Sequence, residues 1–390
     1  MYYDYDPDLK DLREVAASFA QKEIAPHASQ WSRDGAMPPE VFYKLGELGL
    51  MGMLMPEEYG GADAGYVAYV TVMEQIGRAD QSVAAAWNAH STIGSLPIAE
   101  FGTSEQKERW LRPLAEGTAL AAFGLTEAGA GSDAAGISTR AVRTDMGWVL
   151  NGSKMFISNA GTPMSQGVCV LARTGEVEHK RFAVFYVPTG TPGYSTAPKL
   201  EKVGWHALDT RELIFENCEL GDEHIIGAEG AGLRQFLSVL DGGRISVAAL
   251  ALSLAIRAQE LAVQHAKERH QFGQPLAAFQ AIAHKFADME VEIAAARGLV
   301  YQAAWLADNG KPFAREAAIA KLHASEMANR VVSQSVQIHG GYGFMLESEI
   351  SRFFLDSKIL EIGEGTSEVQ RNVIAKHVLA GNMTSRQRGR

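Results

Sequence analysis

The sequence has few cysteines, no long apolar run and no excess of positive charge, and each absence excludes a class of protein. Its two cysteines, Cys169 and Cys218, cannot build a disulfide framework, and neither lies in a C-x-x-C pair or a His/Cys cluster spaced for a metal. We therefore expect a reducing compartment, two structural thiols and no metal site. The acidic start MYYDYDPDLK does not resemble a signal peptide, so the expected location is the cytoplasm.

The apolar and charged residues are distributed in a way that argues against membrane and nucleic-acid binding. The longest apolar run, residues 247–256, lies between Arg244 and Arg257. It falls short of the roughly 20 residues that cross a bilayer, so it predicts a buried helix and no membrane contact. With 36 basic and 46 acidic residues the formal net charge is −10, which gives no general attraction for nucleic acid. A phosphate-bearing ligand would need a local pocket.

The composition is that of a globular protein, and three residue patterns follow one another along the chain. The chain has 390 residues, 46% of them apolar and 21% charged, which suits two or three structural units. Helical spacing of apolar residues follows Asp6 and Pro7, and Thr103 with Gln106 forms a capping-box pattern before another helix. The predicted fold class is therefore α+β, mostly α, with domains at residues 1–120, 121–230 and 231–390.

The residue pattern in the middle of the chain predicts a small antiparallel β domain. Residues 147–150 alternate as a strand does, and the pair Asn151-Gly152 after them is typical of a hairpin turn. Further strands are expected near residues 168–171, 182–187 and 213–215. Beyond Gly232 the sequence returns to long helical patterns, which are broken at glycine and proline near residues 273–275, 310–312 and 340–341.

Two segments rich in glycine could bind an anionic ligand. In FGLTEAGAGSD, residues 123–133, Gly129 and Gly131 leave backbone amides open while Thr126 and Ser132 supply hydroxyl groups. The segment matches neither the G-x-G-x-x-G dinucleotide pattern nor the phosphate-binding loop with its lysine, and a plain loop is an equal alternative. In QIHGGYGF, residues 337–344, three glycines allow close approach of a cofactor, or simply end a helix.

Two further segments place basic residues near helix ends. In LDGGRISV, Asp241 and Arg244 enter an apolar helix, which indicates either a nucleotide site or an ordinary helix start with an acidic first turn. In ERHQFGQPLAAFQ, Arg269 lies beside a Gly-Pro break between helices. It could pair with a pyrophosphate or form an exposed salt bridge.

The last segment, EIGEGTSEVQR, residues 361–371, places Glu364 between two glycines in a loop before a helix. Loops held by rigid elements often carry catalytic side chains, and flanking glycines let a substrate carbonyl reach the backbone amides. Glu364 is therefore a candidate general base, although a loop carboxylate can also be only a helix cap.

These five segments, in this order, resemble the acyl-CoA dehydrogenase family over nearly the whole chain. PEEYGGADA and FGTSEQKERWL are similar to that family's amino-terminal domain. The resemblance implies an N-terminal α-helical domain, a middle antiparallel β-barrel domain and a C-terminal four-helix-bundle domain. It also implies a homotetramer with FAD bound between domains and across subunits. The implied reaction is α,β-dehydrogenation of an acyl-CoA thioester to the trans-2-enoyl-CoA, with electrons passed to an electron-transferring flavoprotein.

The resemblance also assigns site residues. Glu364 matches the catalytic carboxylate. FAD is expected to contact Phe123, Leu125, Thr126, Gly131, Ser132, Phe156, Ile157 and Ser158, and, from a neighbouring subunit, Arg269, Gln271, Phe272, Gln280, Gln337, Gly340 and Gly341, with Thr366 and Glu368 at the adenine half. Acyl-CoA is expected to contact Ser132, Asp241, Arg244 and Gly365.

The family's mechanism gives Glu364 the α proton of the substrate, while its backbone amide binds the thioester carbonyl. A carboxylate beside an acyl chain and a flavin is expected to have a raised pKa, toward about 6–7. The sequence departs from the family at Gly363, where an aromatic residue is usual, at Phe156 in place of tryptophan and at Ala128 in place of proline. Gly363 enlarges the space near the acyl group, so short or branched chains are preferred.

Three alternatives remain open on the sequence. An acyl-CoA oxidase or an enoyl-CoA reductase could use the same fold, and a non-catalytic flavin-binding or scaffold protein could retain it without chemistry.

Overall fold

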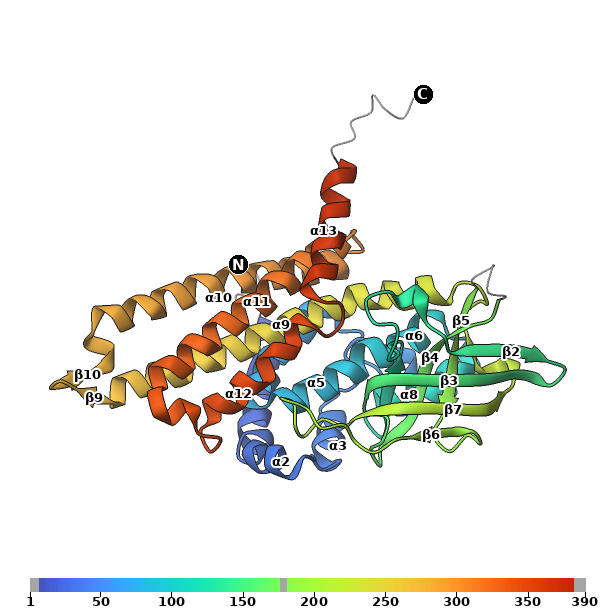
Figure 1. Ribbon diagram of the computed structural model, residues 1–390, viewed down its shortest axis with the longest axis horizontal. Helices are drawn as coiled ribbons and strands as arrows, with labels where there is room; N and C mark the ends of the chain where they lie inside the picture. Colours follow the sequence, from blue (N-terminus) through green and yellow to red (C-terminus); the bar gives the residue numbers. More distant parts are fainter. Residues whose placement is uncertain (1–6, 176–180, 382–390) are drawn as a thin grey trace. The chain divides into compact units, whose positions relative to one another are not determined.

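The computed structural model describes residues 7–175 and 181–381 (Figure 1). Contacts divide the chain into two compact units. The helical unit contains residues 1–29, 66–81 and 244–390, and the sheet unit contains residues 30–65 and 82–243. The order of elements, helices then strands then long helices, confirms the predicted fold class. Both units draw on more than one of the three predicted domains, whose limits stay a prediction.

The sheet unit has short helices before an eight-stranded sheet. Its helices include α3 (Glu40–Glu47), α5 (Gln81–Ala89), α6 (Leu96–Phe101), α7 (Ser104–Gln106) and α8 (Arg112–Ala115). The strands are β1 (Leu120–Gly124), β2 (Arg140–Thr144), β3 (Gly147–Ser158), β4 (Ser165–Arg173), β5 (Phe182–Pro188), β6 (Tyr194–Thr196), β7 (Thr210–Leu220) and β8 (Ile225–Ile226). The three strand regions expected beyond residue 160 are confirmed in β4, β5 and β7.

The strand order in the sheet is β6-β7-β3-β2-β4-β5-β8, with β1 paired to β4. Pairing is antiparallel except between β1 and β4 and between β2 and β4. Side chains of β4 alternate between two apolar clusters, so Cys169 and Leu171 pack on one face while Val168 and Val170 pack on the other. The sheet therefore has an apolar core on both faces.

The predicted hairpin turn at Asn151-Gly152 is wrong. Strand β3 runs through both residues, and its register against β7 shifts between Leu150 and Gly152. Gly152 has φ +139°, and a Cβ there would lie 2.7 Å from the Cα of Thr139. The pair therefore forms an irregularity within one long strand, since the partner β7 continues past it and keeps the ladder together.

Both thiols are buried and free, as expected for structural cysteines. Burial raises the pKa of Cys169, and it raises the pKa of Cys218 to about 11. Neither thiol is poised as a nucleophile at neutral pH, because the thiolate is the reactive form.

The helical unit is built on long helices. They are α1 (Pro7–Phe19), α4 (Gly65–Ala79), most of α9 (Gly232–Glu268), α10 (Gln280–Asp308), α11 (Ala314–His339), α12 (Glu349–Ser357) and α13 (Ser367–Gly381). In Figure 1, α9, α10 and α11 lie side by side. Gln259 of α9 donates to Glu290 of α10 at 3.1 Å, and Arg257 donates to Glu349 of α12 at 2.9 Å.

Helix α9 corrects one expectation and confirms another. It begins at Gly232, so Asp241 lies in its third turn and not at a helix start. The apolar segment after Arg244 is buried, as predicted. By length and hydropathy α9 alone among the described helices could cross a membrane, but 94% of its apolar stretch of 18 residues is buried within the protein. Asp6, which precedes the first predicted helix, lies outside the described residues.

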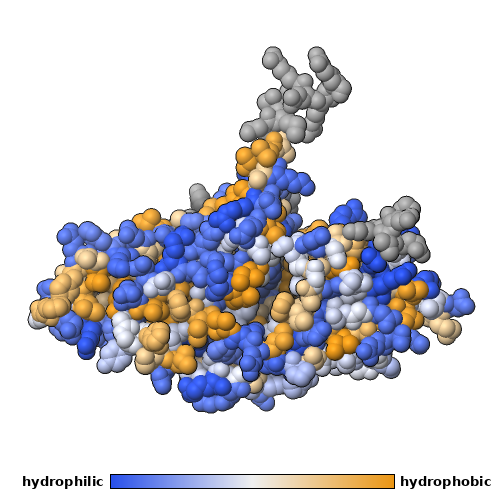
Figure 2. All heavy atoms as spheres, viewed as in Figure 1, coloured by the Kyte–Doolittle hydropathy of each residue, from blue (hydrophilic) through white to orange (hydrophobic). Residues whose placement is uncertain are grey.

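The helix breaks are where glycine and proline predicted them. A short hairpin of β9 (His270–Gln271) and β10 (Gln274–Pro275) separates α9 from α10, and Gly310 and Gly340 follow the ends of α10 and α11. Helix α13 then extends away from the helices of its unit (Figure 1). Its residues Val378 and Leu379 are 51% and 66% exposed, and Figure 2 shows hydrophobic residues at its outer end.

Candidate active site

The predicted site residues fall into three groups, each within one unit. One group lies where β1 and β3 meet in the sheet unit. A second lines a cavity at one end of the long helices, and a third surrounds Glu364 before α13.

The segment after β1 is held by a buried ion pair. The carboxylate of Glu127 accepts hydrogen bonds from the amide of Ser138 (2.6 Å), the amide of Thr139 (2.9 Å) and the ammonium of Lys154 (2.8 Å). Burial by itself would raise the pKa of Glu127, but Lys154 and these hydrogen bonds outweigh it and lower the pKa to about 2. Glu127 therefore stays ionised and fixes the loop that carries the preceding Leu125 and Thr126.

The same contacts bring the first group of predicted residues together. The amide of Met155 donates to the carbonyl of Thr126 at 2.8 Å, which places the segment beside Phe156 on β3. A Cβ on Gly129 or Gly131 would meet nothing within 4 Å, so the fold does not demand glycine there. Open backbone at these positions is available to a ligand. Phe123 is already engaged, because its ring stacks on Phe236 with centroids 4.2 Å apart.

Phe156 presents an exposed aromatic ring from a strained backbone. Its φ is +64°, in the left-handed region, and 65% of its surface is exposed, whereas Ile157 beside it is buried. An exposed ring held on a rigid strand suits stacking with a planar, partly apolar ligand.

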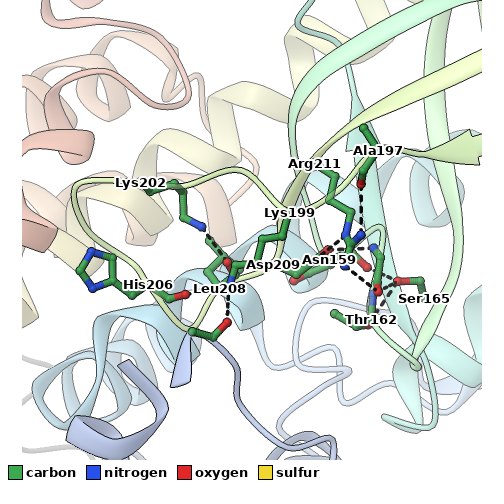
Figure 3. A network of polar contacts seen from close by, with 12 residues as sticks. Asn159, Thr162, Ser165, Ala197, Lys199, Lys202, His206, Leu208, Asp209 and Arg211 are labelled. Atoms are coloured by element: carbon green, nitrogen blue, oxygen red, sulfur yellow. Dashed lines mark hydrogen bonds and ion pairs between the residues drawn. The ribbon is translucent and has the colours of Figure 1, made fainter. Parts of the chain in front are cut away.

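The chain after Ser158 is fixed by a polar network (Figure 3). Asn159 donates through its side chain to the carbonyl of Ala86 at 2.9 Å, and its amide donates to the carbonyl of Asp209 at 3.2 Å. The carboxylate of Asp209 accepts from the amide of Gly161 (2.8 Å) and from Arg211 (2.7 Å). The end of β3 therefore has little freedom, which keeps Phe156 in place.

The second group surrounds a cavity of about 470 Å³ in the helical unit. Four of the predicted FAD residues line it, namely Arg269, Gln271, Gly340 and Gly341. A Cβ on either glycine would meet nothing within 4 Å. A guanidinium, an amide side chain and open backbone are the groups that bind a diphosphate, so this lining fits that part of FAD. Phe272, Gln280 and Gln337 are exposed and lie outside the lining.

Two histidines form another wall of this cavity. The rings of His265 and His339 stack with centroids 4.5 Å apart, and Arg269 lies over the ring of Tyr342 at 6.0 Å. Burial and then the charges of His339 and Arg269 lower the pKa of His265. Neither histidine was predicted as a site residue from the sequence, although His339 lies within the glycine-rich segment of residues 337–344.

The third group is the loop of Glu364, which has an unusual backbone. Glu364 has φ +52° and Gly365 has φ +97°, so two successive residues lie in the left-handed region. The side-chain amide of Gln370 donates to the carbonyl of Gly365 at 2.9 Å, and the ammonium of Lys321 donates to the same oxygen at 2.7 Å. Strain of this kind persists only where neighbours fix it, and it is concentrated at functional sites.

The residues after this loop adopt a capping arrangement. The hydroxyl of Thr366 accepts from the amide of Val369 at 3.3 Å. The pKa of Glu368 is lowered, mainly by a hydrogen bond with its own backbone amide and to a smaller extent by one with the side chain of Thr366. Contact of Thr366 and Glu368 with the adenine half of FAD stays a prediction, as do the acyl-CoA contacts of Ser132, Gly365, Asp241 and Arg244. Arg244 is buried and Asp241 is half-buried, whereas Ser132 is exposed.

Lys321 is a residue of the loop site that was not predicted from the sequence, whereas Gln370 lies within the segment of residues 361–371 that the sequence already singles out. Lys321 shares one helix face with Ala317, Ala324 and Ala328, all fully buried. A lysine on such a face of small residues is the signal that could have found it. In the described ranges, no group of three or more His, Cys, Asp or Glu side chains is arranged to hold a metal.

Comparison with known proteins gives matches over nearly the whole chain. Three family profiles match: acyl-CoA dehydrogenase N-terminal domain over residues 6–118, middle domain over 122–218 and C-terminal domain over 230–379. A probable acyl-CoA dehydrogenase, YngJ of Bacillus subtilis, is 45% identical over 97% of this chain and 100% of its own length. The mitochondrial short-chain specific acyl-CoA dehydrogenase of Rattus norvegicus is 41% identical over 94% and 89%.

Solved structures agree with these relatives. Butyryl-CoA dehydrogenase from Megasphaera elsdenii has a TM-score of 0.92 at 42% identity, covering 95% of this chain and 98% of its own. A chain from work on the electron transferring flavoprotein of Acidaminococcus fermentans has a TM-score of 0.93 at 39% identity, covering 96% and 98%. An acyl-CoA dehydrogenase complexed with FAD from Bacillus anthracis has a TM-score of 0.92 at 34% identity, covering 97% and 68%.

Proposed function

Because the chain belongs to the acyl-CoA dehydrogenase family, we propose that it converts a short or branched acyl-CoA to the trans-2-enoyl-CoA with Glu364 as base. The enzyme class and the cofactor, FAD, follow from the family. The single observation that carries the assignment of the base is the loop in which Glu364 lies in the left-handed region, next to a Gly365 carbonyl that accepts hydrogen bonds from Lys321 and Gln370.

The proposed reaction gives residues of this chain defined parts. The backbone amide of Glu364 donates to the thioester carbonyl and stabilises the negative charge that develops as the α proton leaves. The Glu364 carboxylate takes that proton. Bound FAD would supply the acceptor for the β hydrogen, which leaves as hydride, so that two C–H bonds break and one carbon–carbon double bond forms.

The residues that would hold FAD suit its two ends. Leu125, Thr126 and the exposed ring of Phe156 would hold the flavin, since they are brought together at the end of β3. In the cavity of the helical unit, Arg269 with Gly340 and Gly341 would hold the diphosphate of the FAD of a neighbouring subunit.

Gly363 supports a short or branched substrate. A Cβ at this position would have as its nearest neighbour the carbonyl oxygen of Ile359 at 3.5 Å, which is ordinary van der Waals contact. The fold therefore accepts a side chain here, and glycine leaves space next to the base. The printed names of two relatives, short-chain specific and butyryl-CoA dehydrogenase, support a short chain.

The electron acceptor, the assembly and the location are further parts of the proposal. An electron-transferring flavoprotein is the proposed electron acceptor. The support for it is that one similar structure comes from work on the electron transferring flavoprotein of Acidaminococcus fermentans. A homotetramer is supported by the exposed apolar side chains on α13. The cytoplasm is the proposed location, supported by two free, buried thiols.

The test is an anaerobic titration of the purified, FAD-loaded protein with a panel of straight and branched acyl-CoA thioesters. We expect loss of oxidised-flavin absorbance with short or branched substrates. Glu364→Gln should keep FAD bound and slow this loss by roughly 10²–10⁴-fold, because the base is gone. Glu361→Gln, a matched change three residues earlier, should bleach at close to the wild-type rate. Rapid bleaching by Glu364→Gln would contradict the assignment of the base.

The same preparation separates the alternatives. A reduced flavin that reoxidises within seconds in air would indicate an oxidase. Oxidation of the reduced flavin by enoyl-CoA, faster than reduction by acyl-CoA, would indicate a reductase. A colourless protein, or a flavin that no thioester reduces, would indicate a non-catalytic protein.

A further inference from the structure

Lys321 lies at the centre of the loop site, and nothing in the mechanism above uses it. It lies in α11 and its side chain is fully buried. Burying an ammonium is costly unless other groups compensate for the lost water. On a helix face of alanines a methionine or leucine would pack at lower cost, so packing alone does not account for a lysine here.

The hydrogen bond of Lys321 reaches the residue next to the base. Its ammonium donates to the carbonyl oxygen of Gly365 at 2.7 Å. Gln370 donates to that oxygen at 2.9 Å and to the carbonyl of Glu364 at 3.4 Å. The two left-handed residues are therefore fixed through their carbonyls, one bond being charge-assisted and the others neutral.

The charges around Lys321 come from three other elements and from its own helix. The pKa of Lys321 is lowered to about 8, and burial is the largest cause. The charges of Glu364 and Glu361 raise this pKa, Arg244 of α9 lowers it further, and Glu326 raises it. Glu361 is paired with Lys358, and Glu326 with Arg371 at 2.7 Å. Below about pH 8 the lysine is charged, so its attraction favours an ionised Glu364, since such coupling is reciprocal.

We propose that Lys321 is a positioning residue for proton abstraction: its ammonium fixes the carbonyl of Gly365 and holds the adjacent Glu364 in place as an ionised carboxylate. This inference rests on the proposed function, because it assigns Lys321 a role toward the base of that reaction.

The decisive measurement is kcat/KM against pH for wild type and Lys321→Met, both loaded with FAD. In wild type the rate rises with pH as Glu364 ionises. Removing the positive charge should move the midpoint of this rise upward by about one pH unit. This is the lower end of the pKa shifts that a nearby opposite charge causes in a carboxylate. At a pH below both midpoints kcat should fall about tenfold, while KM changes less than about twofold. Lys321→Arg should return the midpoint toward wild type.

Two control variants separate charge from loop support. Gln370→Met removes neutral hydrogen bonds to the same loop, so it should lower kcat without moving the midpoint. Lys358→Met removes an exposed charge that pairs with Glu361, and solvent screening should leave the midpoint unchanged. A shift with Lys358→Met as large as that with Lys321→Met would overturn a specific role for Lys321.

Hydrogen exchange of residues 362–370 gives a readout that does not depend on turnover. Lys321→Met should speed exchange there by about tenfold, because a charge-assisted bond to the loop is lost. An unchanged midpoint together with unchanged exchange in folded Lys321→Met would overturn the proposal. If that variant does not fold, Lys321→Gln carries the same expectation. Failure of wild type to react with any thioester would instead contradict the proposed function, and the exchange measurement would still decide the role of Lys321.

Discussion

Gly363 and Glu364 are adjacent in the chain, but the backbone places opposite demands on them. Glu364 lies at φ +52°, where glycine would be unstrained, whereas Gly363 has room for a side chain. For the stability of the fold, a larger residue would be favourable at position 363 and a glycine would be favourable at position 364. The chain has the reverse, which is the pattern expected when chemistry and substrate shape decide the residues rather than stability.

Gly363→Tyr should therefore change specificity without damaging the fold. We expect a melting temperature within about 2 °C of wild type, because the Cβ makes only ordinary contacts. The ratio of kcat/KM for a branched acyl-CoA to that for butyryl-CoA should fall by about tenfold or more as the ring fills the space. Gly363→Ala is the control and should retain most of the branched activity. Equal losses for both substrates would contradict a role in shape selection.

Glu127 gives a pH prediction at the same scale. Its pKa is lowered from the ordinary 4.5 to about 2 in the folded protein. Ionised Glu127 therefore stabilises the folded protein by on the order of 2 kcal/mol. This contribution to the free energy of unfolding is fully present above about pH 4.5 and is lost as the pH falls toward 2. Melting curves between pH 7 and pH 3 should show this loss in wild type. The double variant Glu127→Gln, Lys154→Met should show less of it, and an identical slope would contradict the assignment.

At the scale of elements, short-range patterns were predictive where the chain satisfies its own hydrogen bonds locally. Thr103 and Gln106 form the expected capping box, with the amide of Thr103 donating to Gln106 at 2.9 Å and the amide of Gln106 donating to Thr103 at 3.3 Å. The Asn151-Gly152 pair failed because a partner strand, more than sixty residues later, continues the ladder past it. The interpretation of Asp241 as an ordinary helix start was wrong as well, because α9 begins at Gly232 and its first turns pack through Phe236 and Val239, which the local charge pattern does not report.

Thr103→Ala should destabilise the sheet unit by about 1 kcal/mol through loss of the cap, measured by urea denaturation. Thr103→Ser is the matched control and should cost little. Gln106→Ala should cost more than Thr103→Ala, because its side chain also donates to the carbonyls of Glu223 (2.8 Å) and Ile225 (2.7 Å). The opposite order of the two losses would contradict this account.

The same contrast holds for the site. Glu364 and the glycines around it are visible in one short segment, and Arg269 and Gln271 in another. Lys321 lies 44 residues before the carbonyl that it binds, and His265 and His339 meet only because two helices pack. Contacts of this kind depend on the tertiary fold, so no local pattern specifies them.

At the scale of the whole molecule, the proposed tetramer can be tested through α13. Wild type should elute as a tetramer in size-exclusion chromatography with light scattering. A double change of Val378 and Leu379 to Glu should shift it toward smaller species, because charges would enter an apolar contact. Met146→Glu is a matched control at another exposed apolar side chain and should leave the mass unchanged. A monomeric wild type would contradict the proposal.

The division of the chain has a consequence for synthesis on the ribosome. The chain passes from one compact unit to the other after residues 29, 65, 81 and 243. Every segment of the sheet unit has been made once residue 243 has emerged, whereas residues 1–29 and 66–81 wait for the last third of the chain. We expect ribosome-bound chains stalled soon after residue 243 to contain a protease-resistant sheet unit and protease-sensitive early helices. The order of folding would then run from the middle of the gene outward.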